Sequence, residues 1–218
     1  MKHITFYLDF ISPYAYLAFE RLPEALKGIS YSVDYRPVLF AGMLKHYGQL
    51  GPAEIIPKRD WTYRHVMWLA DSLEVPMFMP TNHPFSPLRL LRLALACGDR
   101  VGNTNRYICD TIFKHVWASG ADMDDLANFE TLVAQLKPRY DLQSNDVKNS
   151  LKTNTEAAIN KGIFGVPAIE VDNKIFWGLD ALSMLRDYLR DAHWFEAGGW
   201  EHACQVGAGV TRRQRSID

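Results

Sequence analysis

The most informative absence in this 218-residue chain is that of a Cys-x-x-Cys pair. The chain has three cysteines, Cys97, Cys109 and Cys204, and they are widely spaced. The sequence therefore contains neither a zinc knuckle nor a dithiol redox motif. Few cysteines without a pairing pattern are typical of proteins from reducing compartments, so we expect a cytoplasmic location.

Long apolar runs and an excess of basic charge are also missing. No stretch approaches the roughly 18 apolar residues of a membrane span, and Asp9 interrupts the apolar run that an N-terminal signal peptide needs. The 24 lysines and arginines are balanced by 25 acidic residues, giving a net charge of -1, which argues against a nucleic-acid partner. A hydrophobic content of 48% excludes the composition of disordered chains. We therefore expect a globular protein with neither a membrane nor a nucleic-acid partner.

Two common binding signatures are absent as well. No Gly-x-Gly-x-x-Gly follows a predicted strand, so a dinucleotide site of the Rossmann type is not supported. The seven histidines are scattered and include no His-x-x-x-His pair, so we expect no metal site. Of these histidines, His83 lies in a loop and is placed to line a pocket, whereas His65 and His115 are expected to be structural.

The N-terminal 40 residues predict a strand–helix–strand unit. Residues 3–10 are rich in aromatic and β-branched types and indicate a buried strand. Ser12-Pro13 is a helix start signal, and residues 14–27 place apolar side chains near helical spacing. Residues 29–38 alternate and indicate a second strand. A unit this short predicts two parallel strands joined by a right-handed crossover.

The middle of the chain is predicted to be helical, and strands return near its end. The apolar spacing favours helices over residues 41–47, 57–73, 87–97, 104–118, 123–136 and 145–161. In the second of these helices, we expect the core to be contacted by Trp61, Val66, Leu69 and Leu73. Residues 167–177 predict a hairpin that turns at Asp172-Asn173, and a helix follows over 179–192.

This order of elements predicts an α/β fold of the thioredoxin-like βαβ–ββα plan with a large helical insertion, although other α+β folds begin in the same way. We expect a thioredoxin-like domain made of residues 1–40 and 162–195. A connecting segment and a helical insertion domain occupy residues 41–161, and a flexible tail occupies residues 196–218.

Ser12 is the first candidate for chemistry. It follows the first predicted strand and begins the first predicted helix, where unpaired backbone N–H groups and the positive end of the helix dipole stabilise an anion. A thiolate at such a position has a lowered pKa. In the alternative interpretation, which the residue type alone favours, Ser12 is only the N-cap of the helix.

Three other segments carry candidate binding groups. If the Val166–Pro167 bond is cis, which holds for only about 5–6% of X-Pro bonds, the Val166 backbone can pair with a peptide-like ligand. Asp180, where a strand end leads into a helix, either caps that helix or holds the ammonium group of an amino-acid-like ligand. The segment 45–59 is predicted to be a loop whose cationic side chains suit an anionic ligand, although most loop lysines are merely solvated; its candidate residues are Lys45, Gln49, Lys58 and Arg59.

Taken together, these segments resemble the 2-hydroxychromene-2-carboxylate isomerase family, which is related to kappa-class glutathione transferases and to disulfide oxidoreductases of the thioredoxin superfamily. The match spans residues 3–192 and is carried by residues 6–17, 162–167 and 176–180. In the oxidoreductase branch the first helix opens with Cys-x-x-Cys, where this chain has Ser12-Pro13-Tyr14-Ala15. The resemblance therefore implies that the reacting sulfur is supplied by a bound thiol, glutathione.

The resemblance also implies a role for each candidate residue. Ser12 would be the catalytic residue and hydrogen-bond the glutathione sulfur, and Val166 would pair with the cysteinyl unit beside a cis Pro167. The γ-glutamyl end of glutathione would be held by Trp177, Gly178, Leu179 and Asp180. The substrate, a small aromatic carboxylate, would be contacted by Lys45, Glu54 and His83. The chain departs from the common family pattern at Gln49, His83 and Leu179.

The implied reaction converts 2-hydroxychromene-2-carboxylate to trans-o-hydroxybenzylidenepyruvate, a step of naphthalene breakdown, by reversible addition of the glutathione thiolate. The resemblance further implies a homodimer. Three alternatives remain: a kappa-class-like transferase that conjugates electrophiles at the same site, a disulfide oxidoreductase or thiol-binding module, and a non-enzymatic interaction protein. Because positions 12 and 15 hold no cysteine, the oxidoreductase is disfavoured.

Overall fold

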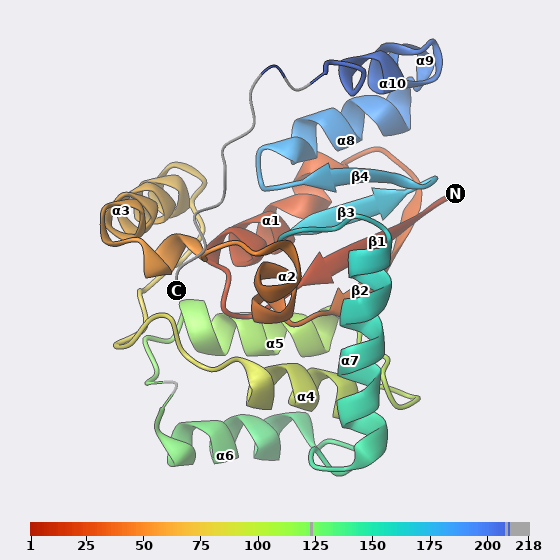
Figure 1. Cartoon of the computed structure of the whole chain (residues 1–218). Helices are drawn as coiled ribbons and strands as arrows, with labels where there is room; N and C mark the ends of the chain where they lie inside the picture. Colours follow the sequence, from red (N-terminus) through yellow and green to blue (C-terminus); the bar gives the residue numbers. More distant parts are fainter. Residues whose placement is uncertain (123, 208, 210–218) are drawn as a thin grey trace, which may run out of the picture.

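The computed structural model describes residues 1–122, 124–207 and 209, and within them a four-stranded mixed sheet has the order β2-β1-β3-β4 (Figure 1). Strand β1 (Lys2–Leu8) pairs in parallel with β2 (Tyr31–Pro37). Strand β3 (Ala168–Val171) is antiparallel to β1 and to β4 (Lys174–Trp177). The predicted parallel unit and the predicted hairpin are both confirmed.

The sheet separates two buried clusters because successive side chains of a strand point to opposite faces. Phe6 and Leu8 of β1 belong to the larger cluster, which includes residues of helices α1 (Pro13–Ala25) and α8 (Ala181–Arg190). Tyr7 belongs to the smaller cluster, together with Ala158 of helix α7 (Asn145–Asn160). Helices therefore cover both faces of the sheet.

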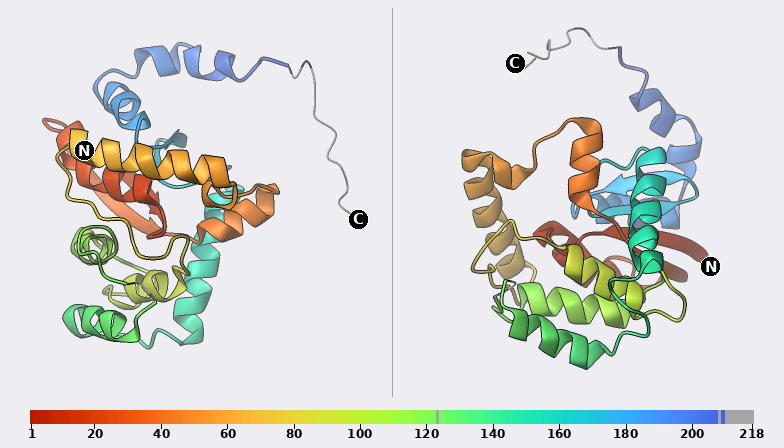
Figure 2. Two further views of the ribbon diagram at one scale, coloured as in Figure 1. Left: turned by 90° about the vertical axis from the view of Figure 1, so that its left-hand side faces the viewer. Right: turned by 60° about the horizontal axis from the view of Figure 1, so that its bottom comes forward.

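The segment between β2 and β3 is helical, as the sequence predicts. It contains α2 (Phe40–Tyr47), the short turn η1 (Pro52–Glu54), α3 (Ile56–Ser72), α4 (Leu88–Ala96), α5 (Arg106–Trp117), α6 (Leu126–Leu136) and α7. Helices α4, α5 and α6 lie together below the sheet in the view of Figure 1. Helix α3 stands apart from these three helices, beside α1 (Figure 2).

The prediction that Trp61 contacts the core is wrong, since 65% of its surface is exposed. Val66 is fully buried, and Leu69 and Leu73 are partly buried against the core as predicted. At about 100° per residue, Trp61 lies about 140° around the helix from Val66, so both cannot face the same core.

Part of the predicted C-terminal tail is helical, whereas its flexibility stays a prediction. After α9 (His193–Glu196), residues Gly199–Ala203 form the short helix α10. The ring of Trp200 lies 5.5 Å from that of Phe176 and 5.7 Å from that of Phe195, which holds α10 against the end of the molecule. Within the predicted tail, residue 208 and residues 210–218 lie outside the described residues.

Candidate functional site

Ser12 stands at the junction of β1 and α1, as predicted. Its hydroxyl oxygen accepts a hydrogen bond from the Ala15 N–H at 3.2 Å, so Ser12 is the N-cap of α1. The same hydroxyl donates to the carbonyl oxygen of Val166 at 3.4 Å. The interpretation of Ser12 as a helix N-cap is therefore confirmed. Ser12 also contacts the candidate segment that contains Val166 and Pro167.

The Val166–Pro167 peptide bond is cis. The Pro167 carbonyl oxygen accepts a hydrogen bond from the Gly178 N–H at 3.0 Å, which ties the start of β3 to the end of β4. Residues from three distant parts of the chain, around positions 12, 166 and 178, thus meet at one end of the sheet. The roles assigned to them from the resemblance stay predictions.

The segment 177–180 borders this junction. Trp177 is half exposed and its ring packs against that of Phe164 at 4.8 Å. A side chain at Gly178, whose φ is +100°, would place its Cβ 2.4 Å from a carboxylate oxygen of Asp180. Asp180 occupies the N-cap position of α8, yet its side chain makes no capping hydrogen bond. That carboxylate therefore stays available for a ligand.

Asp9 underlies the Ser12 turn, and sequence reasoning did not assign it to the site. It is fully buried. One carboxylate oxygen accepts the Ile11 N–H at 3.2 Å and the other accepts the Phe40 N–H at 2.9 Å, while its carbonyl oxygen accepts the Ser12 N–H. Burial raises the pKa of Asp9 to about 7, against the lowering effect of the backbone hydrogen bonds. Asp9 therefore ties the turn that carries Ser12 to the start of α2.

His83 supports the same turn from the other side. Its Nε2 lies 2.9 Å from the Ile11 carbonyl oxygen, and because a carbonyl only accepts, Nε2 carries the proton. Its Nδ1 lies 2.8 Å from the Tyr63 hydroxyl. Burial lowers the pKa of His83, which keeps the ring neutral. Both ring nitrogens are thus engaged within the protein, so any substrate contact of His83 would use its carbon edge or face.

The two other predicted substrate contacts are exposed. Lys45 lies on α2, and Glu54 bends back to accept a hydrogen bond from the Gly51 N–H in the η1 turn. Among the described residues, no hydrogen bond or ion pair joins either side chain to Ser12. Their predicted contact with the substrate stays a prediction.

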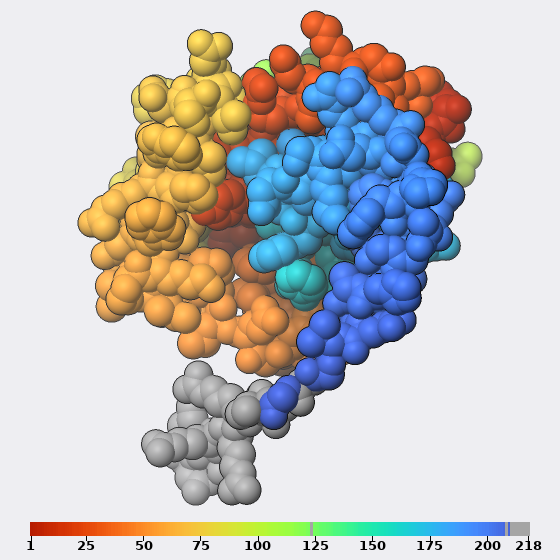
Figure 3. Space-filling view, turned by 90° about the horizontal axis from the view of Figure 1, so that it is seen from above, coloured from red at the N-terminus to blue at the C-terminus, as the bar shows by residue number. Residues whose placement is uncertain are grey.

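Helix α3 forms a wall beside the site. The Tyr14 hydroxyl, on the first turn of α1, is hydrogen-bonded to His65 Nδ1 of α3 at 2.9 Å. Burial raises the pKa of Tyr14, and the carboxylate of Asp180 raises it further. Figure 3 shows the molecule hollowed between the orange α2–α3 segment and the light blue β4–α8 segment, above red N-terminal atoms.

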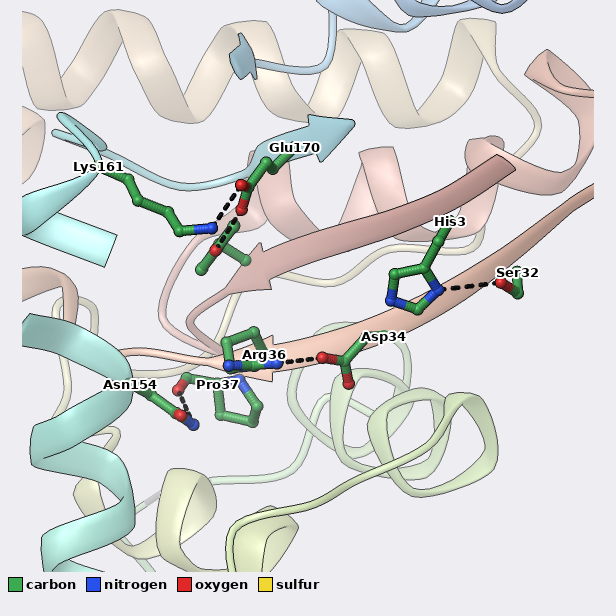
Figure 4. A network of polar contacts seen from close by, with 9 residues as sticks. His3, Ser32, Asp34, Arg36, Pro37, Asn154, Lys161 and Glu170 are labelled. Carbon is green, nitrogen blue, oxygen red and sulfur yellow. Dashed lines mark hydrogen bonds and ion pairs between the residues drawn. The ribbon is translucent and has the colours of Figure 1, made fainter. Parts of the chain in front are cut away.

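A buried polar network fixes β3 next to β1 (Figure 4). The Tyr7 hydroxyl donates to Glu170 at 2.6 Å, and Lys161 forms an ion pair with the other carboxylate oxygen of Glu170. Hydrogen bonds from Lys161 and Tyr7 outweigh burial and lower the pKa of Glu170. This network begins three residues after Pro167 and anchors the strand that the cis peptide bond introduces.

Two of the three cysteines are buried or partly buried thiols. Burial raises the pKa of Cys97 to about 11 and that of Cys109 to about 12, so neither thiol is ionised at neutral pH. Within the described residues, no group of three or more His, Cys, Asp or Glu side chains is placed to hold a metal ion.

Comparison with known proteins gives consistent relatives. The family model of the DSBA-like thioredoxin domain matches residues 3–190. A 2-hydroxychromene-2-carboxylate isomerase of Pseudomonas sp. (strain C18) is 28% identical over 193 residues, covering 84% of this chain and 88% of that protein. Glutathione S-transferase kappa 1 of Rattus norvegicus is 24% identical over 208 residues, covering 88% of this chain and 92% of that protein.

A solved structure gives the same fold. The crystallised selenomethionine form of a 2-hydroxychromene-2-carboxylate isomerase superposes with a TM-score of 0.75 at 23% identity, covering 89% of this chain and 98% of that one. The resemblance found in the sequence is confirmed by these relatives. The expected thioredoxin-like sheet with inserted helices is confirmed as well.

Proposed function

The chain belongs to the family of DSBA-like thioredoxin domains, and we propose that it acts as a glutathione-dependent isomerase of 2-hydroxychromene-2-carboxylate. The observation that carries the proposal is the Ser12 hydroxyl, which stands at the start of α1 beside the cis Val166–Pro167 bond. A thioredoxin-like oxidoreductase needs a thiolate there. Because this chain has serine, a bound thiol would supply the sulfur. Relatives named as isomerases and as kappa-class glutathione transferases support this assignment.

Ser12 and the start of α1 would hold the thiol as a thiolate. The hydroxyl, now donating to Val166, would turn its proton to the sulfur, and the helix dipole would add to the attraction. A charge-assisted hydrogen bond is worth about 1.5–3 kcal/mol, which lowers the thiol pKa by about one to two. The Val166 backbone would pair with the cysteinyl unit, and the carboxylate of Asp180 would receive the γ-glutamyl ammonium.

The chemical step needs no other reagent. The hemiketal ring of the substrate would first open: the bond between C2 and the ring oxygen breaks, its electron pair goes to the phenolic oxygen, and that oxygen takes the proton of the C2 hydroxyl, which leaves a ketone at C2. The thiolate would then add to a conjugated carbon of the ring-opened substrate, and the electron pair of the carbon–carbon double bond would move to the carbonyl oxygen. The former double bond then rotates as a single bond. When the electron pair returns, the carbon–sulfur bond breaks and glutathione leaves unchanged. Lys45, with Glu54 and His83, would contact the substrate during this cycle.

A kappa-class-like transferase is the second candidate, and the relatives named as kappa transferases favour it. It would use the same thiolate, but the thioether would be the product. Analysis of the products separates the two: recovered glutathione with trans-o-hydroxybenzylidenepyruvate supports the isomerase, whereas a stable adduct supports the transferase. On the resemblance, we also propose a homodimer that works in the cytoplasm.

The decisive experiment compares two serine caps. Ser12→Ala is expected to slow isomerisation about 10- to 100-fold, since it removes a charge-assisted hydrogen bond from the thiolate. Ser144→Ala is the matched control, because Ser144 caps α7 by accepting the Val147 N–H at 3.3 Å and lies on another element. Equal turnover by the two variants would remove Ser12 from the mechanism. Calorimetry that shows no binding of millimolar glutathione to the unchanged protein would end the proposal.

A further inference from the structure

Helix α3 carries a row of aromatic rings that the core does not use. Trp61, His65 and Trp68 follow one another at spacings of four and three, which places them on one face of the helix. Trp61 is 65% exposed and Trp68 is 63% exposed. The His65 ring lies 6.0 Å from the ring of Trp61 and 6.1 Å from that of Trp68, with interplanar angles of 15° and 12°. The three rings thus form a nearly parallel series, here called the α3 aromatic row.

The α3 aromatic row lines a surface hollow. Together with Arg64 it borders an open hollow of about 480 Å³, a volume within the range of small-molecule sites. Two indole faces and an imidazole favour stacking with a flat ring system. A guanidinium beside them favours a carboxylate, which it can bind through two parallel hydrogen bonds. The chemistry of the hollow therefore suits a planar aromatic anion.

The α3 aromatic row is connected to the candidate thiol site. His65, its central ring, is hydrogen-bonded through Nδ1 to the Tyr14 hydroxyl at 2.9 Å. Tyr14 is only two residues from Ser12 and is close enough to Asp180 for that carboxylate to raise its pKa. The central ring of the row is therefore tied to a side chain next to Ser12, and the two indole rings lie on either side of it along α3.

Packing within the chain does not account for the row. The buried residues of α3 are Val66 and Ala70, which lie on another face of the helix. Two large indole rings at neighbouring positions of one helix face form an exposed apolar patch of the kind that marks a binding surface. The polar edge that Arg64 adds is typical of a ligand site.

We propose that the α3 aromatic row and Arg64 bind the second substrate, a planar aromatic carboxylate, beside the thiol held at Ser12. The chemical purpose of the site rests on the proposed function. The binding itself does not, since it depends on the four side chains that line the hollow. The α3 aromatic row would then select the second substrate by its ring size and planarity. The residues at the end of the sheet would select the thiol.

The test uses 2-naphthoate as the probe and calorimetry as the measurement. The double variant Trp61→Ala/Trp68→Ala is expected to bind 2-naphthoate at least about tenfold more weakly, because two stacking faces are lost. Trp194→Ala is the matched control, because Trp194 is 52% exposed and lies on another helix, α9. This variant should bind 2-naphthoate as tightly as the unchanged protein does. Arg64→Gln should remove the preference for 2-naphthoate over the uncharged 2-naphthylmethanol.

Three outcomes separate this inference from its competitors. Unchanged binding of 2-naphthoate by the double variant would overturn it. A halved mass in sedimentation together with lost binding would also overturn it, because the row would then be a contact between two copies of the chain. Glutathione binding, measured in the same samples, should be equal in the double variant and the unchanged protein. If the unchanged protein binds 2-naphthoate through the row but no glutathione, this inference stands and the proposed function fails.

Discussion

Asp9 is the residue on which the position of Ser12 most directly depends. Both of its carboxylate oxygens accept backbone N–H groups, one from Ile11 within the turn and one from Phe40 at the start of α2. A carboxylate can satisfy two donors at once, whereas an amide presents one acceptor and one donor group. An acid is therefore required at this position because both of its oxygens accept hydrogen bonds, not because of its size.

Asp9→Asn is accordingly expected to destabilise the protein by about 1–3 kcal/mol, since one buried N–H loses its acceptor. Isomerisation should fall more than glutathione binding, because the turn and α2 lose their common anchor while segment 177–180 stays in place. Urea unfolding and steady-state kinetics at pH 8 measure the two effects. Asp125→Asn is the control, since Asp125 accepts one N–H at the exposed start of α6 and asparagine can replace it. Equal stability of the two variants would contradict the argument.

Single residues also mark the limit of what the sequence predicts about the site. Ser12 and the Val166–Pro167 pair were predicted because each lies in a local pattern that matches a known family. Tyr14 and Asp9 were not, because their roles depend on His65 and Phe40, which are 51 and 31 residues away in the chain. No spacing rule connects such partners before the fold has brought them together.

At the scale of elements, α10 shows how a distant partner overrides a local pattern. Two glycines lie at its start, and its sequence shows no helical periodicity. The sequence therefore favours an irregular tail. Trp200 nevertheless finds the rings of Phe176 on β4 and Phe195 on α9. Burial of such a ring stabilises a short helix that its own propensity does not. The longer helices were predicted well because their apolar residues repeat over several turns.

Trp200→Ala is expected to lower the free energy of unfolding by about 1–3 kcal/mol, less than for a fully buried tryptophan because the ring is only partly covered. Hydrogen exchange should accelerate in α10 and α9, and turnover should change little because Trp200 lies away from Ser12 in the fold. Tyr107→Ala, at an exposed ring on α5, serves as the control. A Trp200 variant as stable as this control would show that α10 is not held by its ring contacts.

At the scale of the whole molecule, the sheet and the inserted helices share one core. The rings of Phe10 and Phe113 lie 4.8 Å apart, and the Trp117 indole donates to the Phe10 carbonyl oxygen at 2.9 Å. Residue 10 directly precedes the Ser12 turn, so α5 helps to hold the candidate site. The predicted division into two domains stays a prediction, and these contacts indicate that the two parts unfold together.

The pH dependence of stability is a property of the whole molecule. Asp9 makes the protein less stable as the pH rises, whereas His83 and His115 make it less stable as the pH falls. Burial raises the pKa of Asp9 to about 7, so the folded protein binds a proton more tightly than the unfolded chain between about pH 4 and 7. The contribution of Asp9 is then fully present below pH 4 and is lost as the pH rises to 7. Burial lowers the pKa values of His83 and His115, and their contribution is lost as the pH falls below about 6.5.

The stability advantage of the unchanged protein over Asp9→Asn should therefore shrink as the pH is raised from 4 to 7, although both proteins keep their histidines. Subtraction of the two urea-unfolding curves at each pH cancels the histidine contribution and leaves that of Asp9. The same subtraction for Ser144→Ala, which removes a helix cap but no ionisable group, should give a flat difference over this range. A flat difference for Asp9→Asn as well would mean that this carboxyl group ionises alike in the folded and unfolded chains. Burial would then not raise the pKa of Asp9, because the hydrogen bonds from the two backbone N–H groups would offset the whole cost of removing the charge from water.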